Sequence, residues 1–214
     1  MDQIFCIGAS SVYGVGGETG GWADMIKQHF HQKMYSAKGV GDKFEVFNFG
    51  KSGAQINFVL NTLPQQIKDY GRDGKIITII SAGGNNIKAK NTADNFVSTL
   101  EEYSNQMSEL LDMAQKLSTH VIIMGSGYYD EKKTTPKTSP FDGSKSFFFN
   151  ERKKLFENKL RELCDEWHIT FLDLDIDEKT WTEKYLHKDG LHANKAGHEY
   201  ITKKIISALD KYID

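Results

Sequence analysis

The sequence contains little cysteine, little proline and almost no net charge. Two cysteines in 214 residues, Cys6 and Cys164, are too few for a disulfide framework, and we expect Cys6 to be a small buried residue. Lys and Arg number 27 against 29 Asp and Glu, which gives a formal net charge of -2. A nucleic-acid-binding protein normally has a strongly basic face, so nucleic acid is not an expected partner.

Long apolar runs are also absent from the sequence. No stretch is long enough to cross a bilayer, so we expect no integral membrane segment. The N-terminal residues show no basic segment followed by an apolar run and a cleavage site, which favours a cytoplasmic protein, although removal of a leader would leave the same sequence. Three prolines and no Gly/Ser-rich linker predict a single domain over residues 1–214.

Short apolar runs alternate with segments of helical periodicity along the whole chain. Strands are predicted near residues 4–7, 44–49, 75–81, 121–124 and 169–172, and helices near 21–35, 56–67, 96–117, 147–167 and 194–209. Pro64 is expected to kink or stop the second helix. This alternation predicts an α/β fold in which a five-stranded parallel sheet has helices on both faces.

Chemically useful residues follow several of the predicted strands. Ser10 comes just after the first, in a turn rich in glycine and other small residues, at the sheet edge where ligands bind in such folds. A serine hydroxyl needs a base to become a nucleophile, and His192 is the candidate base. Asp189 lies three residues earlier and could orient the imidazole and stabilise its charged form. Ser10, His192 and Asp189 are therefore the predicted catalytic residues.

An oxyanion hole can be predicted from two other strand ends. The backbone amides of Ser10 and Gly53, with the side-chain amide of Asn85, could donate to the negative oxygen of a tetrahedral intermediate. Glycine at position 53 would keep a side chain from obstructing the approach of backbone to substrate.

These stretches resemble the four sequence blocks of the SGNH, or GDSL-type, hydrolase family. The matching blocks are Gly8-Ala9-Ser10 with Gly14, Ser52-Gly53, Gly83-Gly84-Asn85, and Asp189-Gly190-Leu191-His192. The resemblance implies a flavodoxin-like three-layer α/β/α fold, the same triad and the same oxyanion hole. It also implies hydrolysis of esters or thioesters without a metal or an organic cofactor.

Two positions depart from the family pattern. Ala9 and Asn86 stand where the family usually has aspartate. Neither position carries one of the family's chemical groups, so we interpret both as altered supporting contacts.

Other uses of these residues remain open from the sequence. His187, Asp189 and His192 could form part of a metal site, although no further ligand with convincing spacing is present. The glycines between Gly8 and Gly17 could cradle a phosphate, but they have neither the P-loop ending nor the spacing of a dinucleotide fingerprint. We expect His198 to be structural or exposed to solvent.

The segment 125–146 has little periodicity and leaves the sheet edge that carries the predicted site. Long loops in compact domains are often functional, so Tyr128 and Tyr129 are candidate substrate-binding residues, or they only pack the loop onto the core. The predicted activity is that of a serine esterase acting on small acyl esters, acetylated sugars included. Lysophospholipids, acyl thioesters and a catalytically idle carbohydrate- or acyl-binding domain are the alternatives.

Overall fold

The structure is a computed structural model that describes residues 1–39, 41, 43–139 and 142–213. Its centre is a five-stranded parallel sheet formed by β1 (Asp2–Gly8), β2 (Phe44–Gly50), β3 (Ile76–Ser81), β5 (His120–Met124) and β8 (Thr170–Leu172). The strand order is β2-β1-β3-β5-β8, and all four pairings are parallel. In chain order this is the 2-1-3-4-5 arrangement of flavodoxin-like folds.

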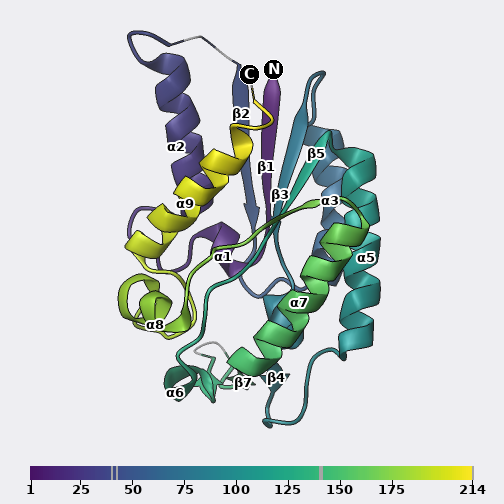
Figure 1. Ribbon diagram of the computed structural model, residues 1–214, viewed down its shortest axis with the longest axis vertical. Helices are drawn as coiled ribbons and strands as arrows, with labels where there is room; N and C mark the ends of the chain where they lie inside the picture. The colour runs from purple at the N-terminus through teal and green to yellow at the C-terminus, as the bar shows by residue number, and fades with distance from the viewer. Residues whose placement is uncertain (40, 42, 140–141, 214) are drawn as a thin grey trace.

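Helices cover both faces of the sheet and give the three layers that the sequence predicts (Figure 1). One face carries α1 (Ser10–Tyr13), α2 (Trp22–Tyr35) and α9 (Lys195–Leu209), and the other carries α3 (Ile56–Tyr70), α5 (Leu100–Leu117) and α7 (Asn150–Glu166). β1 contributes to the hydrophobic cores on both faces of the sheet, because its alternate side chains point to opposite faces. Ile4 and Cys6 pack toward α2 and α9, whereas Phe5 and Ile7 pack toward α3 and α5.

The predicted helices agree with the structure except at some ends. α3 continues through Pro64 to Tyr70, so the predicted early stop at Pro64 is wrong. The apolar stripe of this helix supplies the reason, since Leu63 and Ile67 on either side of the proline are buried in the core. α5 begins at Leu100 rather than at Phe96, because Thr99 caps it through a hydrogen bond from the Glu102 amide.

A small antiparallel sheet lies below the main one and was not predicted. Its strands are β4 (Ala89–Lys90), β7 (Lys145–Phe147) and β6 (Lys137–Thr138), in that order. With α6 (Glu131–Thr134), β6 and β7 occupy the segment 125–146 that lacks periodicity in the sequence. Positions 140 and 141 of this segment lie outside the described residues.

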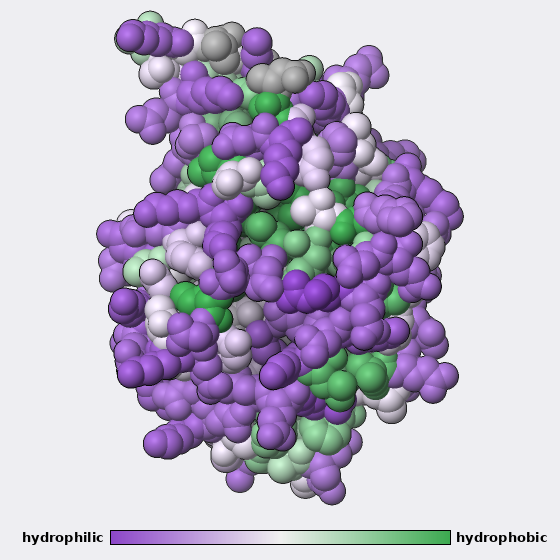
Figure 2. Space-filling model, viewed as in Figure 1, coloured by the Kyte–Doolittle hydropathy of each residue, from purple (hydrophilic) through white to green (hydrophobic). Residues whose placement is uncertain are grey.

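Hydrophilic side chains cover most of the face shown in Figure 2, with apolar ones in small separate patches. Within the described part of the chain, no helix combines the length and the apolar character that membrane crossing requires. The short elements α4 (Gly84–Ile87), α8 (Glu178–Thr180) and the π-helix Trp181–Tyr185 complete the fold. They lie at or near the carboxyl ends of the strands, where the candidate site is found (Figure 1).

Candidate active site

Ser10 begins the short helix α1 immediately after β1. The Ala9 amide donates to Ser81 O at 3.1 Å, which ties this turn to the end of β3. The turn is anchored below by Val12, which is fully buried in the core. Ser10 itself is half-buried and lines a cavity of about 150 Å³ at the sheet edge.

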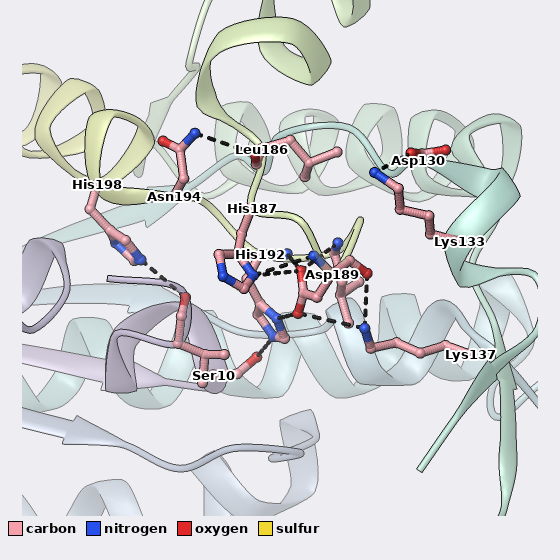
Figure 3. Close-up of polar contacts among 12 residues, drawn as sticks. Ser10, Asp130, Lys133, Lys137, Leu186, His187, Asp189, His192, Asn194 and His198 are labelled. Atoms are coloured by element: carbon pink, nitrogen blue, oxygen red, sulfur yellow. Dashed lines mark hydrogen bonds and ion pairs between the residues drawn. The ribbon is translucent and has the colours of Figure 1, made fainter. Parts of the chain in front are cut away.

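His192 and Asp189 reach Ser10 from the opposite end of the sequence (Figure 3). His192 Nε2 lies 2.9 Å from Ser10 Oγ, and His192 Nδ1 lies 2.6 Å from Asp189 Oδ2. The Asp189 carboxylate accepts a hydrogen bond from the protonated Nδ1, so this geometry leaves the lone pair of Nε2 facing the serine hydroxyl. The structure therefore brings the three predicted catalytic residues together in one hydrogen-bonded chain.

The Asp189 carboxylate is held by its own loop. Its Oδ1 accepts hydrogen bonds from the amides of Leu191 at 3.0 Å and His192 at 3.1 Å. Burial acts to raise the pKa of Asp189, but the hydrogen bonds from the imidazole and these two amides, with the imidazole charge, hold the pKa well below its usual range. Asp189 is thus ionised across the pH range in which a histidine base operates.

Lys137 is a further cation at this carboxylate, and sequence reasoning missed it. Its Nζ donates to the backbone oxygen of Asp189 at 2.9 Å and lies 3.5 Å from Oδ2, the oxygen that also faces His192 (Figure 3). No local signal could have found this residue, because a single lysine in an aperiodic segment has many equivalents on a protein surface. His187 Nδ1 lies 3.4 Å from the other carboxylate oxygen.

The predicted oxyanion donors are brought together in part. Asn85 lines the same cavity as Ser10, and its Nδ2 donates to Ala54 O at 3.0 Å, which fixes the amide and leaves its second N–H available. Gly53 precedes Ala54 directly but is not among the residues that line the cavity. The requirement for glycine there is its φ of +80°, since a Cβ at position 53 would meet no protein atom within 4 Å.

Comparison with known proteins supplies the family. The model of the GDSL-like Lipase/Acylhydrolase family matches residues 6–200. The chain belongs to this family. A lipase/acylhydrolase structure from Enterococcus faecalis superimposes with a TM-score of 0.72 and 16% identity, covering 100% of this chain and 98% of that one. For an acetylxylan esterase from Geobacillus stearothermophilus the TM-score is 0.66 at 15% identity, covering 96% and 92%.

Another sequence match has a different name. A putative 2-hydroxyacid dehydrogenase of Staphylococcus aureus (strain USA300) is 23% identical over 154 residues, which are 72% of this chain and 45% of that protein. The chain thus spans less than half the length of the curated relatives that it matches.

Asn86, one of the two departures from the GDSL-type pattern, has a clear supporting role. It is buried, its Oδ1 accepts from the Ile56 amide at 3.0 Å, and its Nδ2 donates to Ser98 Oγ at 3.3 Å and Gln106 Oε1 at 3.2 Å. An aspartate could accept from Ile56 but could not donate to the other two oxygens. Ala9 contributes its backbone, and its buried methyl group makes no polar contact.

Two polar residues of this region, Ser11 and His198, have structural contacts. Ser11 Oγ accepts a hydrogen bond from Trp22 Nε1 at 3.1 Å. His198 is fully buried, with Nδ1 accepting from the Trp22 amide and Nε2 facing Val15 O, each at 3.1 Å. His198 therefore ties the glycine-rich segment after α1 to α9, and its prediction as structural agrees with this position.

The two tyrosines predicted to bind substrate lie in different surroundings. Tyr129 is buried and lines the cavity beside Ser10. Tyr128 is not among the lining residues, and its ring faces Lys153 Nζ at 4.4 Å. The two side chains diverge because consecutive residues of an extended segment point in opposite directions.

His187, Asp189 and His192, which were considered as metal ligands, contact one another, and the acidic residues near the start of α8 also have protein partners. Over the described ranges, no group of three or more His, Cys, Asp or Glu side chains is arranged to hold a metal ion. Asp173 pairs with Arg161 at 2.7 Å, and Asp177 caps α8 by accepting from the Thr180 amide at 2.9 Å.

Proposed function

We propose that the protein is a serine esterase that hydrolyses esters of short acyl groups through an acyl-enzyme on Ser10. The observation that carries the proposal is the chain of contacts from Asp189 through His192 to Ser10, with heavy-atom separations of 2.6 and 2.9 Å. These separations are within the range over which a base takes a proton from a hydroxyl. Membership of the GDSL-like family supports the reaction class.

In the proposed reaction, Ser10 Oγ attacks the ester carbonyl carbon while its proton passes to His192 Nε2. The resulting oxyanion is stabilised by the Ser10 amide and by the Asn85 side chain, which both line the cavity. Collapse of the intermediate breaks the bond to the alcohol oxygen, which takes the proton from His192. Water then attacks the acyl-enzyme while His192 takes its proton. The bond between the acyl carbon and Ser10 Oγ breaks as that proton passes to Oγ, which releases the acid and restores the serine hydroxyl. The proposed steps require no metal or organic cofactor.

The size of the cavity favours a short acyl group. A volume of about 150 Å³ accommodates a chain of a few carbon atoms. Its lining includes an ion pair between Lys153 and Glu157 with an N–O separation of 2.6 Å, and a long alkyl chain would pack poorly against such a pair. Small acyl esters are therefore proposed over lysophospholipids and long-chain thioesters. Acetylated carbohydrates are included, because a structural neighbour is named an acetylxylan esterase.

Labelling with a fluorophosphonate probe tests the catalytic role. The native protein is expected to be labelled, Ser10→Ala to lose the label completely, and Ser11→Ala to keep it. Because Ser11 receives a hydrogen bond from Trp22, the second variant controls for disturbance of the turn. A native protein that resists the probe would favour the idle binding domain instead.

A series of nitrophenyl esters tests the acyl size. We expect kcat/KM to be highest for acyl groups of two to four carbons and to fall by about tenfold or more at eight. A preference for the longer chains would favour the lipase or thioesterase alternatives.

Hydride transfer, suggested by the name of the staphylococcal match, is not proposed. The turn after β1 lacks the spacing of a dinucleotide fingerprint, and the residue that follows Gly8-Ala9 is the serine bonded to His192.

A further inference from the structure

The cavity beside Ser10 has apolar side chains such as Phe156 and Leu160 in its lining, and several polar groups among them. It lies between the ends of β3 and β5 and the side of α7, so its lining combines Gly83, Asn85 and Gly125 with Tyr103 from α5 and Glu157 from α7. Tyr129 also faces it. A pocket for a plain alkyl chain would be expected to have apolar side chains at these positions.

Tyr103 places a phenol hydroxyl in this lining. Its side chain is buried, with 3% of the residue exposed, and its hydroxyl lies against Gly83, where an added Cβ would be 3.1 Å from Oη and 2.9 Å from the ring. The glycine, which also has a φ of +98°, thus allows the phenol to approach the strand end that carries Asn85. No hydrogen bond joins the Tyr103 hydroxyl to another of the described residues, and the hydroxyl is not sealed off from the cavity that Tyr103 lines, so it can donate to a group that enters there.

Tyr129 supplies a second hydroxyl of the same kind. It is 7% exposed, and its backbone is fixed by Asn150, which accepts from its amide and donates to its carbonyl, each at 2.9 Å. Burial, followed by the charge of Glu157, raises the pKa of both phenols, so each remains a neutral hydrogen-bond donor.

The ion pair beside these phenols limits the charge of the group that can enter. Lys153 and Glu157 have side chains that are 6% and 15% exposed, and each neutralises the other. A carboxylate that entered this cavity would be desolvated without gaining a free cation, because Lys153 is already paired with Glu157. A plain alkyl chain would leave the two tyrosine hydroxyls without partners. The lining is best matched by a neutral oxygen atom that can accept a hydrogen bond.

We propose that this cavity is a subsite for a short acyl group that carries its own hydroxyl or oxo oxygen, with Tyr103 as the main donor to that oxygen. The inference rests on the proposed esterase function and narrows its substrate class. Tyr103 is thereby a specificity-determining residue, because it interacts with the acyl chain and has no part in the proton transfers.

The test compares two esters of equal chain length, 4-nitrophenyl butanoate and 4-nitrophenyl 3-hydroxybutanoate. The native protein is expected to show a kcat/KM about tenfold higher for the hydroxyacyl ester, and Tyr103→Phe to reduce this ratio to near one while butanoate hydrolysis changes less than about twofold. Tyr129→Phe is expected to reduce the ratio less. Tyr128→Phe is the matched control and should retain the native ratio, because Tyr128 does not line the cavity.

Thermal unfolding separates specificity from structure. Since the Tyr103 hydroxyl has no partner in the described residues, Tyr103→Phe should melt at the same temperature as the native protein or higher. Any of three results would overturn the inference. They are a native preference for the butanoate ester, an equal fall in kcat/KM for both esters in Tyr103→Phe, and a marked fall in the melting temperature of Tyr103→Phe. A protein that the fluorophosphonate labels but that does not discriminate overturns this subsite alone. An unlabelled and inactive protein overturns the esterase proposal with it.

Discussion

At the scale of single residues, the candidate site depends on side chains that hold other groups in place. Asn86 accepts from the first amide of α3 while it donates to Ser98 and Gln106, and it is adjacent in sequence to Asn85. His198 joins the Trp22 amide to Val15 O. Both side chains are buried and have satisfied hydrogen bonds. Their replacement should therefore lower the stability of the fold, although neither side chain takes part in the proposed reaction.

His198 should make the protein sensitive to mild acid. Burial lowers the pKa of His198, with a further contribution from the charge of His192, whereas the contact with Val15 O acts in the opposite direction. The unfolded chain therefore binds a proton at a higher pH than the native protein does, and the native state loses stability as the pH falls below about 6.5. We expect the melting temperature to fall between pH 7 and pH 5 more steeply than in His198→Gln.

The variant itself should be less stable at pH 7, by about 1–3 kcal/mol, because at least one buried group loses its partner. His29→Gln, at an exposed position of α2, is the matched control and should follow the native pH dependence. Parallel melting curves for the native protein and His198→Gln across this range would contradict the assignment.

At the scale of elements, the segment between β5 and α7 holds the loop that carries Asp189. The Asp130 amide donates to Gly190 O at 2.9 Å, and Lys137 of β6 donates to Asp189 O at the same distance. An added Cβ at Gly190 would lie 2.8 Å from the Cβ of Lys133, so α6 is packed closely on this loop. The unpredicted elements α6 and β6 thus stabilise the position of Asp189.

Lys137 should also set the lower pH limit of activity. Its ammonium group lies 3.5 Å from Asp189 Oδ2, the same oxygen that contacts the imidazole of His192, so the two cations compete for it. The other titratable groups near this loop are His187, His198 and the Lys133–Asp130 pair. In Lys137→Met the Oδ2 atom of Asp189 loses its second cation and keeps only the imidazole, so its attraction for the imidazolium that forms in the reaction becomes stronger. The acid limb of kcat/KM should move upward by about half a pH unit.

Two variants make this measurement specific to the charge. Lys137→Arg should keep the native profile, and Lys133→Met, which removes a cation from the same segment without touching Asp189, should do so as well. A fall in kcat without a shift of the acid limb in Lys137→Met would mean that Lys137 acts only by holding the loop. Measurements at low and moderate salt should show a smaller shift at the higher ionic strength.

At the scale of the whole molecule, the sequence was sufficient to predict the main sheet and to select three residues that meet at its edge, Ser10, Asp189 and His192, but not to predict the walls of the cavity. The apolar run of β3 and the periodic apolar residues of α5 can be recognised from neighbouring residues in the sequence, because both elements are buried along their length. The sequence blocks that contain Ser10, Asn85 and His192 can be recognised locally in the same way. β4 and β6 have two residues each, which is too short for any periodicity. Lys137 and Tyr103 acquire their roles only when segments distant in sequence meet.

The two cysteines allow the predicted single domain to be tested. Cys6 of β1 is buried in the core between the sheet and the helices α2 and α9. Cys164 belongs to α7 and is buried in the core on the other face of the sheet. Burial raises the pKa of Cys6 far above its usual range and that of Cys164 to about 12, so neither thiol should react in the native protein. Because β1 contributes side chains to both cores, loss of either core should disrupt the other.

Both thiols are therefore expected to become reactive in a single denaturant transition. The measurement is brief alkylation at increasing urea concentration, with the modified fraction of each cysteine determined on separate peptides by mass spectrometry. Coincident midpoints for Cys6 and Cys164 are the expected result, since one cooperative unit exposes both cores together. A lower midpoint for Cys164 would instead mean that the α5–α7 side, which lines the proposed acyl subsite, opens before the sheet does.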